Sequence, residues 1–285
     1  MGSGEGAVRA RATGGPNGAR LCVLASGSGG NCSVLVAGGL VTLIDAGLSP
    51  RRTRRELDAL GLSLGDVGAM VLTHLDTDHA YPGWAGAIPE GCALWVHRRH
   101  LGRAERTGLL RKARCEAFED GFALGAARVS PLLVAHDSLG VASLRFEFAC
   151  GASLGWATDV GRVTEPLVRH LRGTDVLAIE SNYCPAMQRA SGRPEFLKRR
   201  IMGGSGHLSN QECLEAVRRM GPRRHVVALH LSRQCNRPEL VAGLHEGAAY
   251  SLTVTAPDRA IRWVEVSDRG AGVVVPGRPT APLRS

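Results

Sequence analysis

The sequence has no apolar run that approaches the roughly 20 residues needed for a membrane-spanning helix. Its first 20 residues, MGSGEGAVRARATGGPNGAR, lack the apolar segment of a secretory signal, and we expect them to form a disordered leader. These two absences favour a cytoplasmic protein without membrane contact. No linker divides the remaining chain, so we expect one domain over residues 21–270 and a flexible tail over residues 271–285.

Paired cysteines of the C-x-x-C type are also missing. The eight cysteines are scattered, at positions 22, 32, 92, 115, 150, 184, 213 and 235. This spacing supports neither a cysteine-based zinc site nor, without an export signal, a disulfide framework. We therefore interpret most of them as small residues of the core.

Lysine is nearly absent as well. Only Lys112 and Lys198 stand among the 35 basic residues, and the others are arginine. The net charge of +9 can attract polyanions such as nucleic acid. Glycine, alanine and arginine dominate together, however, which indicates a compositional bias of the source genome. The charge by itself therefore does not identify a nucleic-acid-binding protein.

The apolar pattern predicts an α/β protein. Short apolar runs at residues 21–26, 32–37 and 40–47 are separated by glycine and predict neighbouring strands. Helices are expected to begin at Ser49 and at Ser209, each followed by helix-forming residues. Strands mixed with helices recur in the second half, which two sheets with helices on their outer faces would accommodate. The longest polar interruption, residues 187–206, we interpret as a functional loop.

The segment VLTHLDTDHA, residues 71–80, places potential metal ligands at the end of a predicted buried strand. His74 and Asp76 are two residues apart, so in extended backbone they share a face. The following turn can bring Asp78 and His79 to a neighbouring position. Two cations about 3.5–4 Å apart would polarise a substrate oxygen and activate a bridging water. The alternative for this segment alone is a polar surface turn.

Other predicted strands end in the same kind of residue. His136 ends the apolar run PLLVAH, Asp159 ends LGWATD, and His230 ends HVVALH. Such a recurrence is hard to attribute to chance. It predicts a shared rim of metal ligands along one edge of the sheets.

Together these motifs resemble the metallo-β-lactamase superfamily. THLDTDH resembles its H-x-H-x-D-H signature, and segments 43–47 (LIDAG), 135–137 (AHD), 157–161 (ATDVG) and 228–232 (ALHLS) resemble its other motifs in order. LASGSGGNCSVLV near the start and GHLSN at 206–210 are similar to a small bacterial branch of exonuclease-like phosphodiesterases. The resemblance covers about residues 21 to 245 and implies a four-layer αββα sandwich of two mixed sheets flanked by helices.

The resemblance also implies two divalent metal ions, with zinc, manganese and iron as candidates. The first site would consist of His74, Asp76 and His136, the second site of Asp78, His79 and His230, and Asp159 would bridge the two. Asp45 would orient a ligand through a hydrogen bond, as metal-bound histidines require.

Asp76 departs from the family pattern, in which a histidine is usual. An aspartate can still coordinate, and it brings negative charge and a hard oxygen donor, which suits Mn, Mg or Fe better than an all-imidazole site. The alternative is that Asp76 is too short to reach, which would leave a single firmly held ion.

A second pair of residues resembles the proton-donating Glu and His of ribonuclease Z, the tRNA 3′-end-processing enzyme. Glu180 ends the run VLAIE, and His207 precedes a predicted helix. His207 would protonate the leaving oxygen while Glu180 holds and polarises the imidazole, so the implied catalytic residues are His207, Glu180 and Asp78. General acid catalysis contributes typically 10²–10⁴-fold. Without the resemblance, a lone histidine before a helix would be a surface or capping residue.

Several basic side chains lie between these two catalytic segments, and we consider Arg193, Lys198, Arg199 and Arg200 as candidates for phosphate binding. The alternative is an ordinary solvated loop. Asn31, in the glycine-rich segment SGSGGN, could line the cleft by resemblance. That segment lacks the G-K-[ST] ending of a P-loop.

The favoured function is a metal-dependent phosphodiesterase, most simply a nuclease that acts on DNA or RNA. A hydrolase of lactones, esters or cyclic phosphodiesters remains an alternative, because fold does not determine function. A metal-binding accessory protein with impaired catalysis, suggested by Asp76, is the third. The choice between DNA and RNA, endo or exo action, and the oligomeric state stay open at this point.

Overall fold

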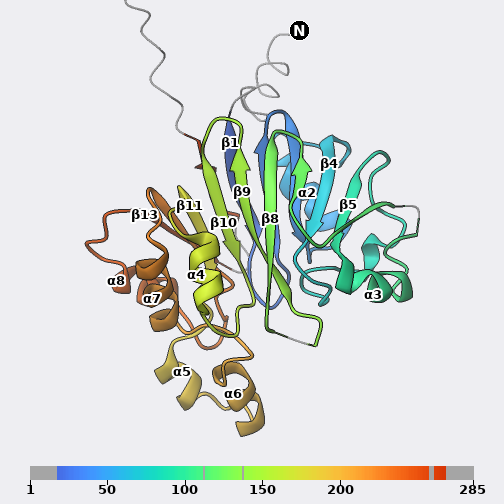
Figure 1. Ribbon diagram of the computed structural model, residues 1–285. Coiled ribbons are helices and arrows are strands. Elements are labelled where there is room, and N and C mark those ends of the chain that lie inside the picture. The colour runs from blue at the N-terminus through green and yellow to red at the C-terminus, as the bar shows by residue number, and fades with distance from the viewer. Residues whose placement is uncertain (1–17, 112, 137, 257–259, 268–285) are drawn as a thin grey trace, which may run out of the picture.

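Two seven-stranded sheets form the centre of the protein (Figure 1). The computed structural model describes residues 18–111, 113–136, 138–256 and 260–267. The first sheet contains, in spatial order, β14 (Val264–Glu265), β1 (Ala19–Ala25), β2 (Cys32–Ala37), β3 (Leu40–Ala46), β4 (Val67–Leu72), β5 (Ala93–His97) and β6 (Arg114–Phe118). The second contains β13 (Ser251–Val254), β12 (His225–Leu229), β11 (Val176–Glu180), β10 (Ser153–Ala157), β9 (Val141–Phe148), β8 (Ala127–Val134) and β7 (Phe122–Leu124).

Both sheets are mixed. In the first, β3 to β6 pair in parallel, whereas β1 pairs antiparallel with β2 and β14. In the second, β10 to β13 pair in parallel, and β7 to β10 pair antiparallel with one another. Because β8 and β10 are each antiparallel to β9, they run in the same direction. The carboxyl ends of β8, β10, β11 and β12 therefore lie along one edge of the second sheet.

The helices in the described residues are α2 (Pro50–Asp58), α3 (Leu101–Arg106), α4 (Glu165–Leu171), α5 (Pro185–Ala190), α6 (Glu195–Met202), α7 (Asn210–Met220) and α8 (Pro238–Leu244), with 3₁₀ turns at Leu64–Asp66, Pro82–Trp84 and Arg98–His100. All but two of these helices cover the outer faces of the sheets, and α5 and α6 lie beyond one end of them (Figure 1). None of the helices in the described ranges is long and apolar enough to cross a lipid bilayer.

Three apolar layers account for the stacking. The layer between the sheets contains Ile44 and Val71 from the first sheet and Phe146 from the second, all fully buried. A second layer joins the outer face of the first sheet to α2 through Leu57, and a third joins the second sheet to α4 and α7 through residues such as Val217. The alternating strand residues thus bury both faces of each sheet. The predicted αββα sandwich is confirmed.

The two predicted helix starts are also confirmed. The Ser49 hydroxyl accepts a hydrogen bond from the Arg52 amide at 3.3 Å. Ser209 and Glu212 form a reciprocal capping box at the start of α7, with the Ser209 amide donating to Glu212 Oε2 at 2.7 Å. These caps satisfy amide groups that the first helical turn leaves without partners.

The expected loop over residues 187–206 is wrong. Most of this segment forms α5 and α6, which lie together beyond one end of the sheets in Figure 1. Both helices are polar on most of their surface, because only a narrow apolar edge, including Met187, Leu197 and Ile201, is packed. The leader is predicted over residues 1–20, but its last two residues belong to β1 instead, which begins at Ala19. The rest of the leader up to residue 17 and the tail over residues 271–285 lie outside the described residues.

Candidate metal centre

Three polar residues at strand ends have left-handed backbone. Asp45 has φ of 60°, Asp159 has φ of 50° and His230 has φ of 57°, and they are the non-glycine residues with positive φ in the described ranges. Non-glycine residues rarely adopt this conformation, and it costs about 1 kcal/mol or more where it occurs. At all three strand ends the turn directs a carboxylate or imidazole toward the same cluster of side chains. Such strain is typical of functional sites.

One hydrogen-bonded chain orients two of the histidines. His79 Nδ1 lies 2.8 Å from Asp45 Oδ2, and the Thr73 hydroxyl lies 2.9 Å from Asp45 Oδ1 and 3.0 Å from His74 Nδ1. The hydroxyl has one hydrogen, and an ionised Asp45 can only accept, so Thr73 donates to Asp45 and accepts from His74. Both imidazoles then carry their hydrogen on Nδ1 and present Nε2 to the cluster. The predicted orienting role of Asp45 agrees with this geometry.

The first site gathers His74, Asp76 and His136. His74 Nε2 is 3.8 Å from Asp76 Oδ2, and the three potential ligand atoms lie within 4.8 Å of one another. His136 Nδ1 donates to the Gly206 carbonyl oxygen at 3.0 Å, which leaves its Nε2 available. Asp76 is divided between two partners, because its Oδ1 accepts a 2.8 Å hydrogen bond from Arg103 on α3. One carboxylate oxygen of Asp76 is thus engaged by an arginine, and the other faces the site.

The second site gathers Asp78, His79 and His230. Asp78 Oδ2 lies 3.8 Å from His79 Nε2 and 3.7 Å from His230 Nε2. Both histidines are almost completely buried, with exposures of 0% and 2%. Asn31 does not point into the cleft as predicted. It is buried, and its side-chain nitrogen lies 2.9 Å from His79 Nε2 and 3.2 Å from the Asp78 carbonyl oxygen, so it contacts the candidate ligand atom of His79 itself.

Asp159 stands between the two sites. Its Oδ2 lies 2.5 Å from His79 Nε2 and 3.8 Å from His74 Nε2, and its Oδ1 lies 3.3 Å from His230 Nδ1. A carboxylate in this position can bridge two cations. The seven residues that the sequence predicted as ligands are therefore brought together at one place.

The donor set fits divalent cations. His230 Nε2 is buried and has no hydrogen-bond partner among the described residues, although a buried polar atom is normally paired. It points toward Asp78, as a ligand atom of the second site would. Imidazole nitrogens with several carboxylate oxygens suit zinc, iron or manganese.

Charge interactions dominate the protonation of the cluster. Burial alone would lower the pKa of His79, but the Asp159 and Asp45 carboxylates outweigh it and raise that pKa well above its ordinary value. Burial also lowers the pKa of His230, but the carboxylates of Asp159, Asp78 and Glu180 together outweigh it and raise that pKa to about 9. The pKa of Asp159 is held well below its ordinary value, because the cationic His230 and His79 outweigh burial. Cation binding to these histidines must displace protons, so metal affinity should increase with pH.

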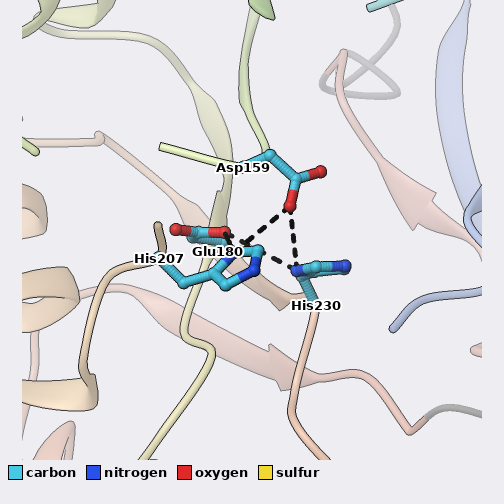
Figure 2. Close-up of side chains that lie close together, drawn as sticks. All are labelled: Asp159, Glu180, His207 and His230. Carbon is cyan, nitrogen blue, oxygen red and sulfur yellow. Dashed lines mark hydrogen bonds and ion pairs between the residues drawn. The ribbon is translucent and has the colours of Figure 1, made fainter. Parts of the chain in front are cut away.

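Glu180 and His207 form a contact pair beside the cluster (Figure 2). Glu180 is fully buried at the end of β11, and its Oε1 accepts hydrogen bonds from the Leu208 amide at 2.6 Å and the Val160 amide at 3.1 Å. Its Oε2 lies 3.2 Å from His207 Nδ1. Because Leu208 follows His207 and Val160 follows Asp159, Glu180 fixes both loops at once.

His207 is held as an acid rather than as a base. Its Nδ1 lies 3.2 Å from both Glu180 Oε2 and Asp159 Oδ1, so the hydrogen on Nδ1 points to carboxylates and Nε2 remains available. Burial lowers the pKa of His207, but Glu180 and Asp159 outweigh it and raise that pKa to about 10. A divalent ion bound to Asp159 would reduce this shift. The side chain keeps 21% of its surface exposed, so it can reach a substrate.

Six of the seven candidate ligands and His207 line a cleft of about 450 Å³, and the seventh ligand, His79, is fully buried. Two of the four predicted phosphate-binding residues, Arg193 and Arg200, also line it. The other two, Lys198 and Arg199, line a separate hollow on the opposite side of α6, where the Lys198 ammonium donates to the Arg189 carbonyl oxygen at 2.9 Å. The structure thus separates the four basic residues into two groups.

Several supporting residues could not be identified from the sequence. Arg103 reaches Asp76 from a helix 27 residues away, and no motif marks it. Asn182 donates to the His230 carbonyl oxygen at 2.8 Å, and the Ser26 hydroxyl accepts from the His230 amide at 2.7 Å. Asn182 lies in the segment AIESNY and Ser26 in SGSGGN, so their place in these motifs could have marked them as candidate site residues. Their contacts with His230 could be identified only from the structure.

Two curated relatives align with nearly the whole chain. Exodeoxyribonuclease WalJ from Streptococcus pneumoniae is 29% identical over 266 residues, which cover 87% of this chain and 98% of the relative. Exodeoxyribonuclease YycJ from Bacillus anthracis is 27% identical over 228 residues, which cover 78% of this chain and 86% of the relative.

Solved structures show the same fold at low sequence identity. The metallo-β-lactamase fold protein YhfI from Bacillus subtilis has a TM-score of 0.66 at 12% identity, over 86% of this chain and 99% of that one. Zn²⁺-bound PqqB from Methylobacterium extorquens has a TM-score of 0.64 at 15% identity, over 85% of this chain and 99% of that one. The short form of human tRNase Z has a TM-score of 0.61 at 15% identity, over 85% of this chain and 98% of that one.

The family assignment rests on a match to two thirds of the chain. Residues 42–231, which are 190 of the 285 residues, match the family described as the beta-lactamase superfamily domain. This range contains all seven candidate ligands together with Asp45, Glu180 and His207. The chain therefore belongs to the beta-lactamase superfamily.

Proposed function

We propose that this protein is a metal-dependent phosphodiesterase that hydrolyses nucleic acid. The observation that carries the proposal is the contact between the buried Glu180 and His207, because His207 lines the same cleft as six of the seven candidate ligands. A phosphodiester needs such an acid, because an alkoxide is a poor leaving group. The relatives named as exodeoxyribonucleases support DNA as the first substrate to test.

Each ligand residue has a part in this proposal. His74, Asp76 and His136 would hold one ion, Asp78, His79 and His230 would hold the other, and Asp159 lies where it could contact both. Bound ions of this kind neutralise the charge on a phosphate and lower the pKa of bound water. Asp45 and Thr73 keep both imidazoles in the tautomer that presents Nε2.

The acid pair acts on the leaving oxygen. His207 keeps its Nδ1 hydrogen on Glu180 and Asp159, so the proton that it transfers is the one on Nε2. Glu180 stays ionised, since the positive charge of His207 outweighs its burial and lowers its pKa. The resulting ion pair holds the ring in one orientation while Nε2 loses and regains a proton.

We infer that manganese or iron suits the first site better than zinc does. Asp76 contributes a carboxylate oxygen where a histidine is usual, and oxygen-rich sites favour harder cations. The second site, with two imidazoles, also accepts zinc.

A metal-resolved screen tests the proposed function. Metal-free protein is supplied with Mn²⁺, Zn²⁺ or Fe²⁺ and assayed on single- and double-stranded DNA and RNA, on bis(p-nitrophenyl) phosphate and on a lactone. We expect degradation of at least one polymer, with binding that weakens as salt is raised. Turnover of the small molecules with no action on polymers would establish a small-molecule hydrolase instead. No turnover of any substrate, with metal bound, would establish an accessory protein.

We also propose a cytoplasmic location. All eight cysteines lie within the described residues and are free thiols, including the exposed Cys150. Free thiols persist in reducing compartments. Fractionation of cells that express the tagged protein tests this, and recovery mainly outside the cytoplasm would contradict it.

A further inference from the structure

One face of helix α6 lines the cleft, and the opposite face lines a separate hollow. Leu197 and Ile201 pack against the buried Tyr183, and these two residues also line the cleft together with Arg200. Lys198 points to the opposite hollow. The helix is therefore anchored along one edge, and the side next to Arg200 is directed at the mouth of the cleft.

Phe196 lies between Arg200 and Arg199 on the surface of α6, and it does not itself line the cleft. It precedes Arg200 by four residues, and side chains at this spacing are neighbours on a helix surface, about 6 Å apart along the axis. Phe196 is 69% exposed in a chain whose aromatic content is only 4%. Scattered exposed apolar residues are common in proteins. What distinguishes Phe196 is that its neighbour on the helix, Arg200, lines the cleft.

The two cationic groups of the cleft, Arg193 and Arg200, have no carboxylate partner among the described residues. Arg200 makes no side-chain hydrogen bond or ion pair there. Arg193 is fixed by three neutral acceptors, because its nitrogens donate to Gln188 Oε1 at 3.1 Å, Gln234 Oε1 at 3.1 Å and Ser232 Oγ at 3.3 Å. Two guanidinium groups with uncompensated charge thus line the cleft beside the candidate metal centre, where an anionic backbone would be attracted.

We propose that α6 is a platform for an unpaired nucleic-acid strand, with Phe196 stacked on a base and Arg200 bound to the adjoining phosphate. This inference rests on the proposed function. Stacking on an aromatic ring together with a guanidinium on the phosphate is how proteins hold single strands. A duplex offers base faces only at its ends, so an internal duplex segment cannot use Phe196. The substrate is therefore a single strand, or a strand end that is unpaired where it enters the cleft.

A binding experiment tests the platform with matched controls. Metal-loaded wild type and the variants Phe196→Ala and Arg200→Gln are titrated with a fluorescent single-stranded DNA 12-mer, with the same strand carrying one abasic position moved along it, and with a blunt duplex hairpin. Leu240→Ala removes another exposed apolar side chain, 41% exposed on α8. Arg199→Gln removes the same charge from the opposite face of α6.

We expect Phe196→Ala to weaken single-strand binding about 5- to 100-fold, the range for loss of one stacked base. Phe196→Tyr should retain wild-type binding. One abasic position should weaken wild-type binding by a similar factor and have no further effect on Phe196→Ala, since both changes remove the same contact. Arg200→Gln should reduce the slope of log affinity against log salt by about 0.7, the contribution of one phosphate contact to a single strand. Leu240→Ala and Arg199→Gln should match wild type.

Two outcomes would overturn the platform and leave the proposed function standing. In the first, Phe196→Ala and Leu240→Ala bind the single strand equally well. In the second, the wild-type protein binds and cleaves only the duplex. A wild type that neither binds nor cleaves any nucleic acid would overturn both the platform and the nuclease proposal, so the two failures can be told apart.

Discussion

The two candidate cation sites are made of similar residues but are supported differently. In the second site, His79 and His230 are almost completely buried. His230 directly follows β12, and Asp45 on β3 holds His79, in the turn after β4, through one hydrogen bond. In the first site, Asp76 is 34% exposed and tied to Arg103, and His136 depends on a carbonyl oxygen in the segment before α7. Buried groups thus support the histidines of the second site, whereas a partly exposed arginine contact and a loop carbonyl support the first. We expect the second site to bind its ion more tightly.

The largest expected effect comes from removing one histidine from each site. His230→Ala should eliminate binding at the second site and lower hydrolysis by about 10⁴-fold, because several kcal/mol of charge stabilisation are lost. His136→Ala should lose the first ion alone and retain the second. Metal content by mass spectrometry and titration with Mn²⁺ measure the difference. If His136→Ala loses as much metal as His230→Ala, the sites are equivalent and the comparison is wrong.

A smaller effect separates chemistry from metal binding. His207→Ala should keep both ions and lower kcat on an ordinary phosphodiester by roughly 10²–10⁴-fold. A p-nitrophenyl leaving group needs little protonation, so its hydrolysis should fall much less. Glu180→Gln should act in the same direction, and the double variant should lose much less than the product of the two, because the residues act as a unit.

Equal losses on good and poor leaving groups would falsify the acid role. Loss of an ion from His207→Ala would instead make His207 a ligand, since Asp159, Glu180, His207 and His230 also lie close enough to hold a cation.

Next come the residues that orient the histidines. Asp45→Asn should weaken the second site about 10- to 100-fold, the usual cost of losing such a support. Thr73→Val removes only the hydroxyl that links Asp45 to His74, so it should weaken the first site and spare the second. Isothermal titration of both variants with Mn²⁺ gives the two affinities. The reverse pattern would show that the hydrogen-bonded chain is assigned in the wrong order.

The smallest effect concerns the partner of Asp76. Arg103→Gln removes a positive charge beside the first site, and for a partly exposed pair we expect its Mn²⁺ affinity to rise by no more than about 5-fold. Arg106→Gln, an exposed arginine on the same helix, is the control. Asp76→His should shift the preference of the first site from manganese toward zinc. A fall in affinity for Arg103→Gln would mean that Arg103 serves mainly to hold Asp76 in place.

Sequence reasoning located the ligands because they follow strands. The carboxyl ends of strands that run in one direction meet at one edge, so His136, Asp159 and His230 could be grouped without coordinates. The caps at Ser49 and Ser209 were equally local signals. Arg103 could not be found, because its contact with Asp76 depends on how α3 packs against a loop 27 residues earlier.

The segment 187–206 was misjudged for a related reason. Its polar composition resembles a loop, yet Pro185 and Pro194 lie at helix starts, where proline is well tolerated. Only the direction of each side chain around α6 separates Arg200, on the cleft, from Arg199, on the opposite side. The sequence could not separate these two arginines. Because the helix was not predicted, the side of it on which each residue lies could not be predicted either.

The left-handed backbone at Asp45, Asp159 and His230 has a consequence for evolution and engineering. Glycine adopts this conformation without penalty, so glycine at any of the three would relieve strain while deleting a carboxylate or an imidazole. A thermostability screen that rewards folding alone should therefore accumulate glycine there and yield robust proteins without catalysis. By the same logic, a natural homologue with glycine at all three positions would be recognisable from its sequence as a pseudoenzyme that kept the scaffold and gave up the reaction.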